Sequence, residues 1–292
     1  MKLREYQQKD AEFLASLPCS ACFNEQRTGK TPTALETIKL RHLKDKRILI
    51  VTTASSLYQW KEEYEKWIQK DCQICLGTPI KKLKIIQKEW KYGLVVSLES
   101  FKETSNRSGL VKPILEMKPE MIILDEAHKI KNPKSANAKA IFRTTNIPYR
   151  LALTGTPAQG KPYDIYSILK FLFPSDFRGF WKFLEEYFII EDQTIYRNGK
   201  PQHFKTYERY QNGKDKQLQE NIAKFSTQRK RADVMPWLPE KFYERVRLEP
   251  TNDQSKYLKE LQETYRTGEI TTVGTLDRLV RYRQICLDLG LS

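Results

Sequence analysis

Short β-rich apolar runs alternate with longer amphipathic segments through the first half of the chain. The apolar runs that we predict as strands are 19–23, 47–52, 73–76, 94–97, 121–124 and 150–153. The segments with helical spacing between them are 3–17, 31–43, 56–69, 80–90 and 136–143. Strands that alternate with helices of about a dozen residues predict βαβ units and a parallel sheet. The continuous apolar run MIIL at 121–124 is typical of a central strand covered on both faces.

The pattern changes in the second half. We expect an aromatic helix at 176–188 and then a hairpin that turns at Asn198–Gly199, since this dipeptide between alternating apolar residues favours a two-residue turn. Polar helical sequence follows until a turn-rich break at 236–239, and a strand at 242–248 with two further helices should come next. These changes divide the chain into three predicted parts, with the bounds 1–174, 175–235 and 236–292.

Composition and charge narrow the class of protein. The 292 residues are 39% hydrophobic and 11% aromatic, which is enough to fill a core and excludes a wholly disordered chain. Lys and Arg total 51 against 36 Asp and Glu, and the net charge of +15 suits a polyanionic partner such as nucleic acid, although a solvated lysine surface gives the same count. No stretch approaches the roughly 20 apolar residues of a membrane span.

The start of the chain and the cysteines indicate the cellular compartment in which the protein works. The opening MKLREYQQKD has no apolar signal-peptide core. We therefore expect a cytoplasmic protein, with a bacterial or phage-type host favoured, or a nuclear one in a eukaryote. Two CxxC pairs occur, at 19–22 and 72–75, but 49 residues separate them, well beyond common zinc-ribbon spacings. We expect buried, reduced thiols and no zinc.

The segment NEQRTGKT, at 24–31, follows a predicted strand and opens a predicted helix, as a phosphate-binding loop does. Gly29 would let the backbone approach a phosphate, Lys30 would reach the β- and γ-phosphates, and the Thr31 hydroxyl would ligate Mg²⁺. The general phosphate-loop pattern is half met, because Asn24 stands where its first glycine belongs. A simple turn and helix cap remains the alternative for this segment alone.

Two further segments place polar residues after predicted strands. MIILDEAH, at 121–128, puts Asp125 and Glu126 at the carboxyl end of its strand, where ligands of open α/β sheets bind. Asp125 would hold Mg²⁺ and Glu126 would orient and deprotonate an attacking water. RLALTGTP, at 150–157, ends in Thr154, which could sense the γ-phosphate. Solvated acids at a strand end and a plain turn are the alternatives.

These motifs in this order resemble the first motor lobe of superfamily-two helicases, and more closely the Swi/Snf-like DNA translocase ATPases. The resemblance covers nearly all of the chain and implies a RecA-like P-loop lobe, with a central parallel sheet flanked by helices, at 1–174. The helical and hairpin extension and the linker towards a second lobe would follow it. The segments that carry the resemblance are LREYQ at 3–7, VTTASSLYQWKEEYEKW at 51–67, VVSLES at 95–100, DEAHKIKNPKSANAKA at 125–140 and LTGTPAQGKPYDIYSILKFLFP at 153–174.

The resemblance also implies roles for single residues. Gln7 matches the family's adenine-reading glutamine, and Arg27 and Thr28 join the nucleotide-binding loop. Arg27 stands where the family usually has glycine, and it adds a cation near the phosphates. The residues that the resemblance assigns to the nucleic-acid backbone are Thr53, Ala54, Ser55, Ser97 and Lys131.

The resemblance implies an ATP-binding motor lobe that uses ATP and Mg²⁺ and acts on nucleic acid, with double-stranded DNA as the favoured substrate. No segment resembles the family's second lobe, which carries an arginine finger. Because such a finger contributes roughly 10³–10⁵ in rate, we expect weak hydrolysis unless a second motor lobe or partner chain supplies it. The alternatives are a strand-separating helicase and a nucleic-acid-binding or nucleotide-switch module that hydrolyses nothing.

Overall fold

The computed structural model separates the chain into two compact units, Met1–Leu238 and Pro239–Ser292. Each unit is described by itself below. The predicted three-part division at 174 and 235 stays a prediction. The residues that the structure describes are 2–102, 109–158, 160–197, 200–207, 209–237, 244, 249–264, 266–267, 270–271 and 275–287.

A seven-stranded sheet, in which every neighbouring pair is parallel, forms the centre of the first unit. The strand order is β3-β4-β2-β5-β6-β1-β9. The strands are β1 (Cys19–Cys22), β2 (Ile48–Thr52), β3 (Cys72–Ile74), β4 (Gly93–Ser97), β5 (Met121–Leu124), β6 (Tyr149–Leu153) and β9 (Ser226–Thr227). The six predicted strands are confirmed, and with them the RecA-like α/β fold.

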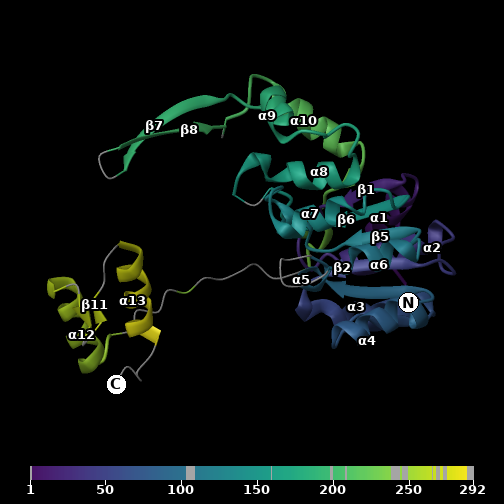
Figure 1. Ribbon diagram of the computed structural model, residues 1–292, viewed down its shortest axis with the longest axis horizontal. Helices are drawn as coiled ribbons and strands as arrows, with labels where there is room; N and C mark the ends of the chain where they lie inside the picture. Colours follow the sequence, from purple (N-terminus) through teal and green to yellow (C-terminus); the bar gives the residue numbers. More distant parts are fainter. Residues whose placement is uncertain are drawn as a thin grey trace. The chain divides into compact units, whose positions relative to one another are not determined.

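Helices cover both faces of this sheet (Figure 1). One face packs against α1 (Glu5–Ala15), α2 (Lys30–Leu40) and α3 (Leu57–Ile68). The helical elements on the other face are the π-helical turn Ile85–Glu89 after α4 (Pro79–Lys84), α5 (Leu98–Phe101), α6 (Val111–Glu116), α7 (Ala136–Phe142) and α8 (Tyr166–Leu172). The short helices α5, α6 and α8 were not predicted, because four to seven residues carry too little periodicity.

Burial on both faces explains why all four residues of the central strand β5 are apolar. Side chains alternate across a strand, so Ile122 and Leu124 enter the core under α5–α8, while Met121 and Ile123 enter the core under α1–α3. All four are fully buried. The prediction of a strand covered on both faces is confirmed.

The part of the first unit that follows α8 adds one more strand to the sheet. It contains α9 (Phe180–Tyr187), the hairpin of β7 (Glu191–Arg197) and β8 (Lys200–Thr206), α10 (Lys214–Ala223) and α11 (Arg231–Val234). The predicted hairpin is confirmed, although its turn residues 198–199 lie outside the described residues. Strand β9 was not predicted. It extends the sheet beside β1, where Ala21 N–H donates to Phe225 O at 2.9 Å and Phe23 N–H to Thr227 O at 2.8 Å.

The second unit contains two helices, α12 (Asn252–Thr264) and α13 (Thr275–Leu287), as expected, and the two-stranded ladder of β10 (Arg266–Thr267) and β11 (Ile270–Thr271). The strand predicted at 242–248 falls outside the described residues except for Glu244. In the parts of the chain that the structure describes, no helix is long and apolar enough to cross a membrane.

The two CxxC pairs lie far apart in the sheet. Cys19 and Cys22 belong to β1, whereas Cys72 begins β3 and Cys75 follows it, and four strands separate β1 from β3. All four cysteines are buried, and burial raises the pKa of the Cys22 thiol, which disfavours the thiolate that zinc binds. The predicted burial of these thiols is confirmed, and the two pairs cannot hold one metal ion together.

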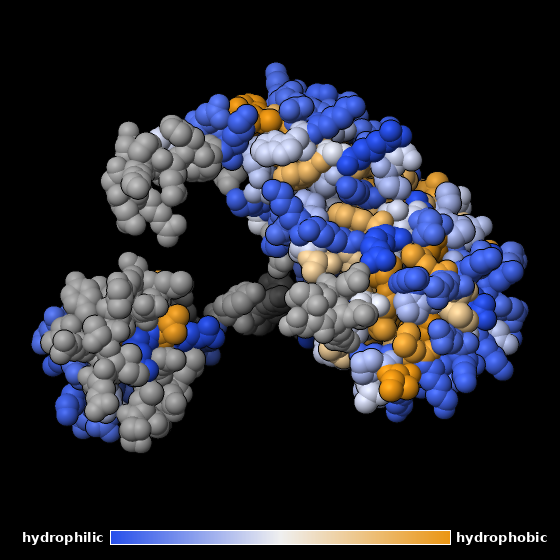
Figure 2. Space-filling view, in the orientation of Figure 1, coloured by the Kyte–Doolittle hydropathy of each residue, from blue (hydrophilic) through white to orange (hydrophobic). Residues whose placement is uncertain are grey.

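The surface of the first unit is mostly hydrophilic on the face shown in Figure 2, with hydrophobic residues scattered between. One of the exposed apolar residues is Ile80, on α4, which is 82% exposed. It offers a matched comparison with the fully buried Ile123 of β5.

We predict that Ile123→Ala lowers the free energy of unfolding by about 2–5 kcal/mol, because it leaves a cavity between two packed layers. Ile80→Ala should change it by less than about 0.5 kcal/mol. Denaturant unfolding followed by circular dichroism measures both. Equal effects of the two substitutions would contradict the described packing.

Candidate functional site

The three motifs found in the sequence meet at one edge of the sheet. Strand β6 lies between β1 and β5, with Cys22 opposite Leu153 and Leu124 opposite Ala152. Because the strands are parallel, the segments that follow them leave from the same carboxyl edge, the ligand-binding edge of such sheets. The loop at 24–29, the Asp125–Glu126 pair and Thr154 therefore follow three consecutive strands.

The loop after β1 is shaped for close approach of an anion. Gly29 has φ +83° and precedes α2, whose first backbone N–H groups face out of the helix. The Lys30 ammonium donates to the carbonyls of Asn24 at 3.0 Å and Glu25 at 3.1 Å, and the Thr28 hydroxyl donates to Glu25 O at 2.7 Å. The Lys30 ammonium thus bonds to carbonyls of its own loop. A phosphate oxygen, being negatively charged, can attract the ammonium away from them.

Helix α1 braces this loop from behind. Gln7 Nε2 donates to Thr28 O at 3.0 Å, Gln7 Oε1 accepts from the Arg4 backbone N–H at 3.0 Å, and the Tyr6 hydroxyl donates to Thr28 O at 2.7 Å. A Cβ on Gly29 would lie 2.2 Å from Gln7 Nε2 and would push that amide away, and the φ of +83° also favours glycine there. Gln7 therefore holds the loop, and its predicted contact with adenine stays a prediction.

Arg27 has the left-handed backbone conformation, with φ +66°, that favours glycine. Its side chain is exposed. The resemblance implies a glycine at this position, and the positive φ explains that preference. The arginine side chain is not needed for the fold of the loop.

Asp125 follows β5 and is held by three donors. Its Oδ2 accepts from the Thr52 hydroxyl and the Trp60 indole N–H, both at 2.8 Å, and its Oδ1 accepts from the Glu126 backbone N–H at 2.9 Å. A carboxylate has about four lone-pair positions, so one stays open on Oδ1. Sequence reasoning missed the role of Trp60, although a buried indole N–H usually finds a partner, and that partner here is Asp125.

Thr31 and Asp125 form the candidate metal-binding pair. Within the described part of the chain, the half-buried Thr31 hydroxyl has no hydrogen-bond partner. A hydroxyl and a single carboxylate oxygen fit Mg²⁺, which prefers oxygen ligands and keeps several waters. These two side chains are the residues that would hold the ion.

Glu126 is linked to Thr154 through His128. The Nδ1 atom of His128 lies 3.2 Å from Glu126 Oε2 and 3.0 Å from Thr154 Oγ1. Burial lowers the pKa of His128, while the carboxylate of Glu126 raises it by a smaller amount. The histidine thus joins the segment after β5 to the segment after β6, and its neutral form is favoured in the folded protein.

The segment after β6 also contacts the loop after β1. A Cβ built on Gly155 would lie 3.2 Å from Gln26 N and 3.4 Å from Asn24 O. The absence of a side chain at this glycine lets the two backbones pack together. The predicted phosphate loop, the acidic pair and Thr154 thus belong to one site.

The segment after β9 also stabilises the loop after β1. Asp10, which is 1% exposed, accepts from Asn24 Nδ2 at 2.8 Å and from Arg229 Nη2 at 2.8 Å, and Glu25 N–H donates to Arg229 O at 3.0 Å. Arg229 therefore stabilises the loop from within the chain. Nothing in the sequence near Asp10 indicated this ion pair, because its partner is 219 residues away.

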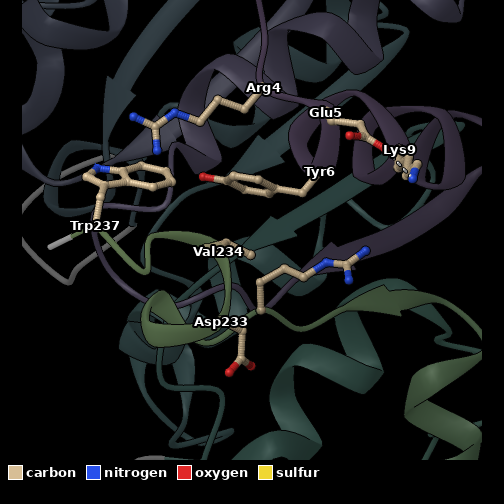
Figure 3. Close-up of a pocket in the computed structure, with 8 residues that line it drawn as sticks. Arg4, Glu5, Tyr6, Lys9, Asp233, Val234 and Trp237 are labelled. Atoms are coloured by element: carbon tan, nitrogen blue, oxygen red, sulfur yellow. Dashed lines mark hydrogen bonds and ion pairs between the residues drawn. The ribbon is translucent and has the colours of Figure 1, made fainter.

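A pocket opens beside the start of α1. Figure 3 shows Arg4, Tyr6 and Trp237 around the same space, with the Arg4 guanidinium near the indole ring. The Arg4 Cζ atom lies 4.6 Å from the centre of the Trp237 ring. Because the Tyr6 hydroxyl bonds to Thr28 O, this aromatic pocket adjoins the phosphate loop. Its flat aromatic and guanidinium surfaces suit a nucleobase.

The residues predicted to bind nucleic acid follow β2, β4 and β5. Residues 53–55 follow β2, where Ala54 and Ser55 are exposed in a 3-10 turn (Ala54–Ser56). Ser97 ends β4, is 5% exposed and caps α5 by accepting from Ser100 N–H. Lys131 is half-exposed, with its ammonium 3.8 Å from Asp164 Oδ2. These residues share the carboxyl edge, and their contact with nucleic acid stays a prediction.

The fold and the three converging motifs define a RecA-like motor lobe of the superfamily-two helicase type. The family model of the SNF2-related domain matches residues 6–291, and the chain belongs to this family.

Individual relatives agree with this assignment. Chromatin structure-remodeling complex subunit snf21 of Schizosaccharomyces pombe is 25% identical over 98% of this chain and 24% of its own length. SWI/SNF-related matrix-associated actin-dependent regulator of chromatin subfamily A member 1 of Homo sapiens is 30% identical over 60% of this chain and 17% of its own length. The chain thus spans about a quarter or less of these relatives.

The fold is also similar to a solved structure, the Sulfolobus solfataricus SWI2/SNF2 ATPase core in complex with dsDNA. The TM-score is 0.61 at 21% identity, over 98% of this chain and 58% of that chain.

We predict that Gly29→Ala weakens the binding of nucleotide at least tenfold, because its Cβ would displace Gln7 and strain the loop. Gly213→Ala is the matched control, since Gly213 also has a positive φ, +72°, but lies outside the site and a Cβ there would meet nothing within 4 Å. It should keep binding within a few-fold. Titration with a fluorescent ATP analogue measures both, and unchanged binding in Gly29→Ala would contradict the described loop.

The lowered pKa of His128 predicts a pH dependence of stability. Below the ordinary histidine pKa of about 6.5, the unfolded chain takes up a proton that the folded protein resists, so the free energy of unfolding falls as pH decreases. His128→Asn should flatten this fall between pH 6.5 and 5. Urea unfolding across that interval measures the slopes, and equal slopes in both proteins would refute the role of burial.

Proposed function

We propose that this chain is the ATP-binding lobe of a nucleic-acid-dependent ATPase that translocates on double-stranded DNA. The convergence of Lys30, Asp125 and Glu126 on one sheet edge is the observation that carries the proposal. The triphosphate would sit on the loop at 24–31 and the N-terminus of α2, where Lys30 exchanges its carbonyl contacts for phosphate oxygens. Adenine would enter the pocket of Tyr6 and Trp237, next to Gln7.

Mg²⁺ would be held by the Thr31 hydroxyl and by Asp125, directly or through its waters, and would neutralise charge on the phosphates. Thr52 and Trp60 fix the Asp125 carboxylate in one orientation, so it does not reorganise when the ion binds. Glu126 would orient a water and accept its proton. His128, neutral between Glu126 and Thr154, would couple that carboxylate to the segment that senses the γ-phosphate.

The nucleic acid would lie over the loops after β2 and β4 and over the segment after Asp125–Glu126. The strand order supports this arrangement, because β5 separates the nucleotide loops after β6 and β1 from the loops after β2 and β4. The net charge of +15 suits phosphate contacts, so binding should weaken steeply with salt. The name of the solved relative, a SWI2/SNF2 ATPase core in complex with dsDNA, supports duplex DNA as the ligand.

We propose that a second motor lobe, in a longer chain or in a partner, completes the catalytic site. The solved SWI2/SNF2 core, of which this chain covers 58%, supports this. Hydrolysis by this lobe by itself should be weak. We expect the protein to work in the cytoplasm, or in the nucleus of a eukaryote.

We predict that Glu126→Gln lowers DNA-stimulated phosphate release by about 10²–10⁴-fold, as expected for loss of a general base, while ATP binding changes little. Lys30→Ala should instead abolish binding. Glu116→Gln, an exposed substitution of the same kind, serves as control. The assay needs the second lobe supplied with this chain.

Two results would replace the proposal. Unchanged turnover in Glu126→Gln, or turnover that DNA does not stimulate, would favour a binding or switch module. Release of a labelled strand from a duplex would instead favour a strand-separating helicase.

A further inference from the structure

A second pocket lies away from the nucleotide loops. It is formed by the segment after Asp125–Glu126, the 3-10 turn Pro162–Ile165, the start of α9 and the residues after β8. Four of its lining residues are aromatic, namely Tyr163, Phe180, Trp181 and Tyr207. The proposed ATPase cycle uses none of these four residues.

The aromatic rings form a connected cluster. The ring centres of Tyr163 and Tyr207 are 4.6 Å apart, and Trp181 meets Tyr207 edge to face at 6.1 Å. Phe180 packs against Tyr163 at 6.2 Å. Trp181 is nevertheless 50% exposed, so a large indole surface, backed by a second ring, faces solvent. Such a surface is suited to stacking against a flat ligand.

A buried carboxylate lines the same pocket. Asp164 is 7% exposed, and its Oδ2 atom accepts no hydrogen bond from the described residues. Lys131 Nζ lies 3.8 Å from this atom and forms an ion pair with it. The Oδ2 atom itself is out of reach of solvent. The carboxylate therefore lies beneath the pocket surface, where its charge pairs with one of the lining lysines and a ligand in the pocket does not contact Oδ2.

The charges around the pocket decide the class of ligand. An aromatic cluster with a carboxylate also suits a methylated ammonium group. However, three lysines, Lys131, Lys134 and Lys161, line the pocket against the single carboxylate of Asp164, and Lys161 Nζ lies 5.5 Å from the Tyr163 ring centre. A cationic peptide would be repelled, whereas a polyanion that carries flat rings would be attracted.

We propose that this pocket binds an unpaired nucleobase of a single-stranded nucleic acid. The base stacks on Trp181 and Tyr207, and the lysines bind the flanking phosphates. The proposal rests on the proposed function only for the class of ligand, nucleic acid, and it needs no ATP.

Stacking and charge do not distinguish one pyrimidine from another. Cytosine and thymine have almost the same size and both stack, so we expect the pocket to accept either base.

The test uses the full 292-residue chain and fluorescein-labelled 12-mers of dC and dT, with anisotropy measured at one salt concentration and neutral pH. Oligo(dC) and oligo(dT) should bind with similar affinity. Trp181→Ala should weaken oligo(dC) binding about 5- to 150-fold, the range for loss of one stacked base, and Trp181→Phe, which keeps a ring, should restore most of it.

Three results would overturn the proposal: no oligonucleotide binding by the natural sequence, equal binding by Trp181→Ala, or tight binding of a trimethyl-lysine peptide instead. Thermal unfolding of each variant shows that it is folded. Duplex DNA and an ATP analogue, titrated in parallel, separate the two proposals: both should bind Trp181→Ala as before. If both bind but Trp181→Ala leaves oligo(dC) binding unchanged, the pocket proposal fails and the motor assignment stands. An oligo(rC) series shows whether RNA binds equally.

Discussion

The structure depends on one geometric constraint, the parallel pairing of β1, β6 and β5. Parallel strands send all of their following segments out at the same edge of the sheet. Lys30, Thr154 and Asp125 are far apart in the chain, yet each follows one of these three neighbouring strands. If any one of them were antiparallel, its polar residues would lie at the opposite edge and no common site would exist.

Within this constraint, side-chain hydrogen bonds between strands fix the orientation of the charged groups. Thr52 and Trp60 hold Asp125 from the β2 side, and His128 joins Glu126 to Thr154 on the β6 side. The loops proposed to bind nucleic acid and those proposed to bind nucleotide therefore meet at β5. Such a connection gives a physical route by which one ligand can change the position of groups that contact the other.

Residues 175–237 are integral to the first unit. Strand β9 pairs with β1, Arg229 bonds to the buried Asp10 behind the phosphate loop, and Trp237 lines the pocket beside Tyr6. The same part supplies Trp181 and Tyr207 to the aromatic pocket. The extension thus completes the nucleotide loop on one side and forms a separate surface on the other.

The sequence by itself determined six of the seven strands of the sheet, the fold class and the motif residues. An apolar run between turn signals and a polar residue at its end are local features. It did not reveal β9, the bonds of Asp125 to Thr52 and Trp60, or the pair of Asp10 and Arg229. Those contacts join residues from 65 to 219 positions apart or rest on a two-residue strand. Only the packing of the sheet decides which distant side chains become neighbours, since no local pattern encodes strand order.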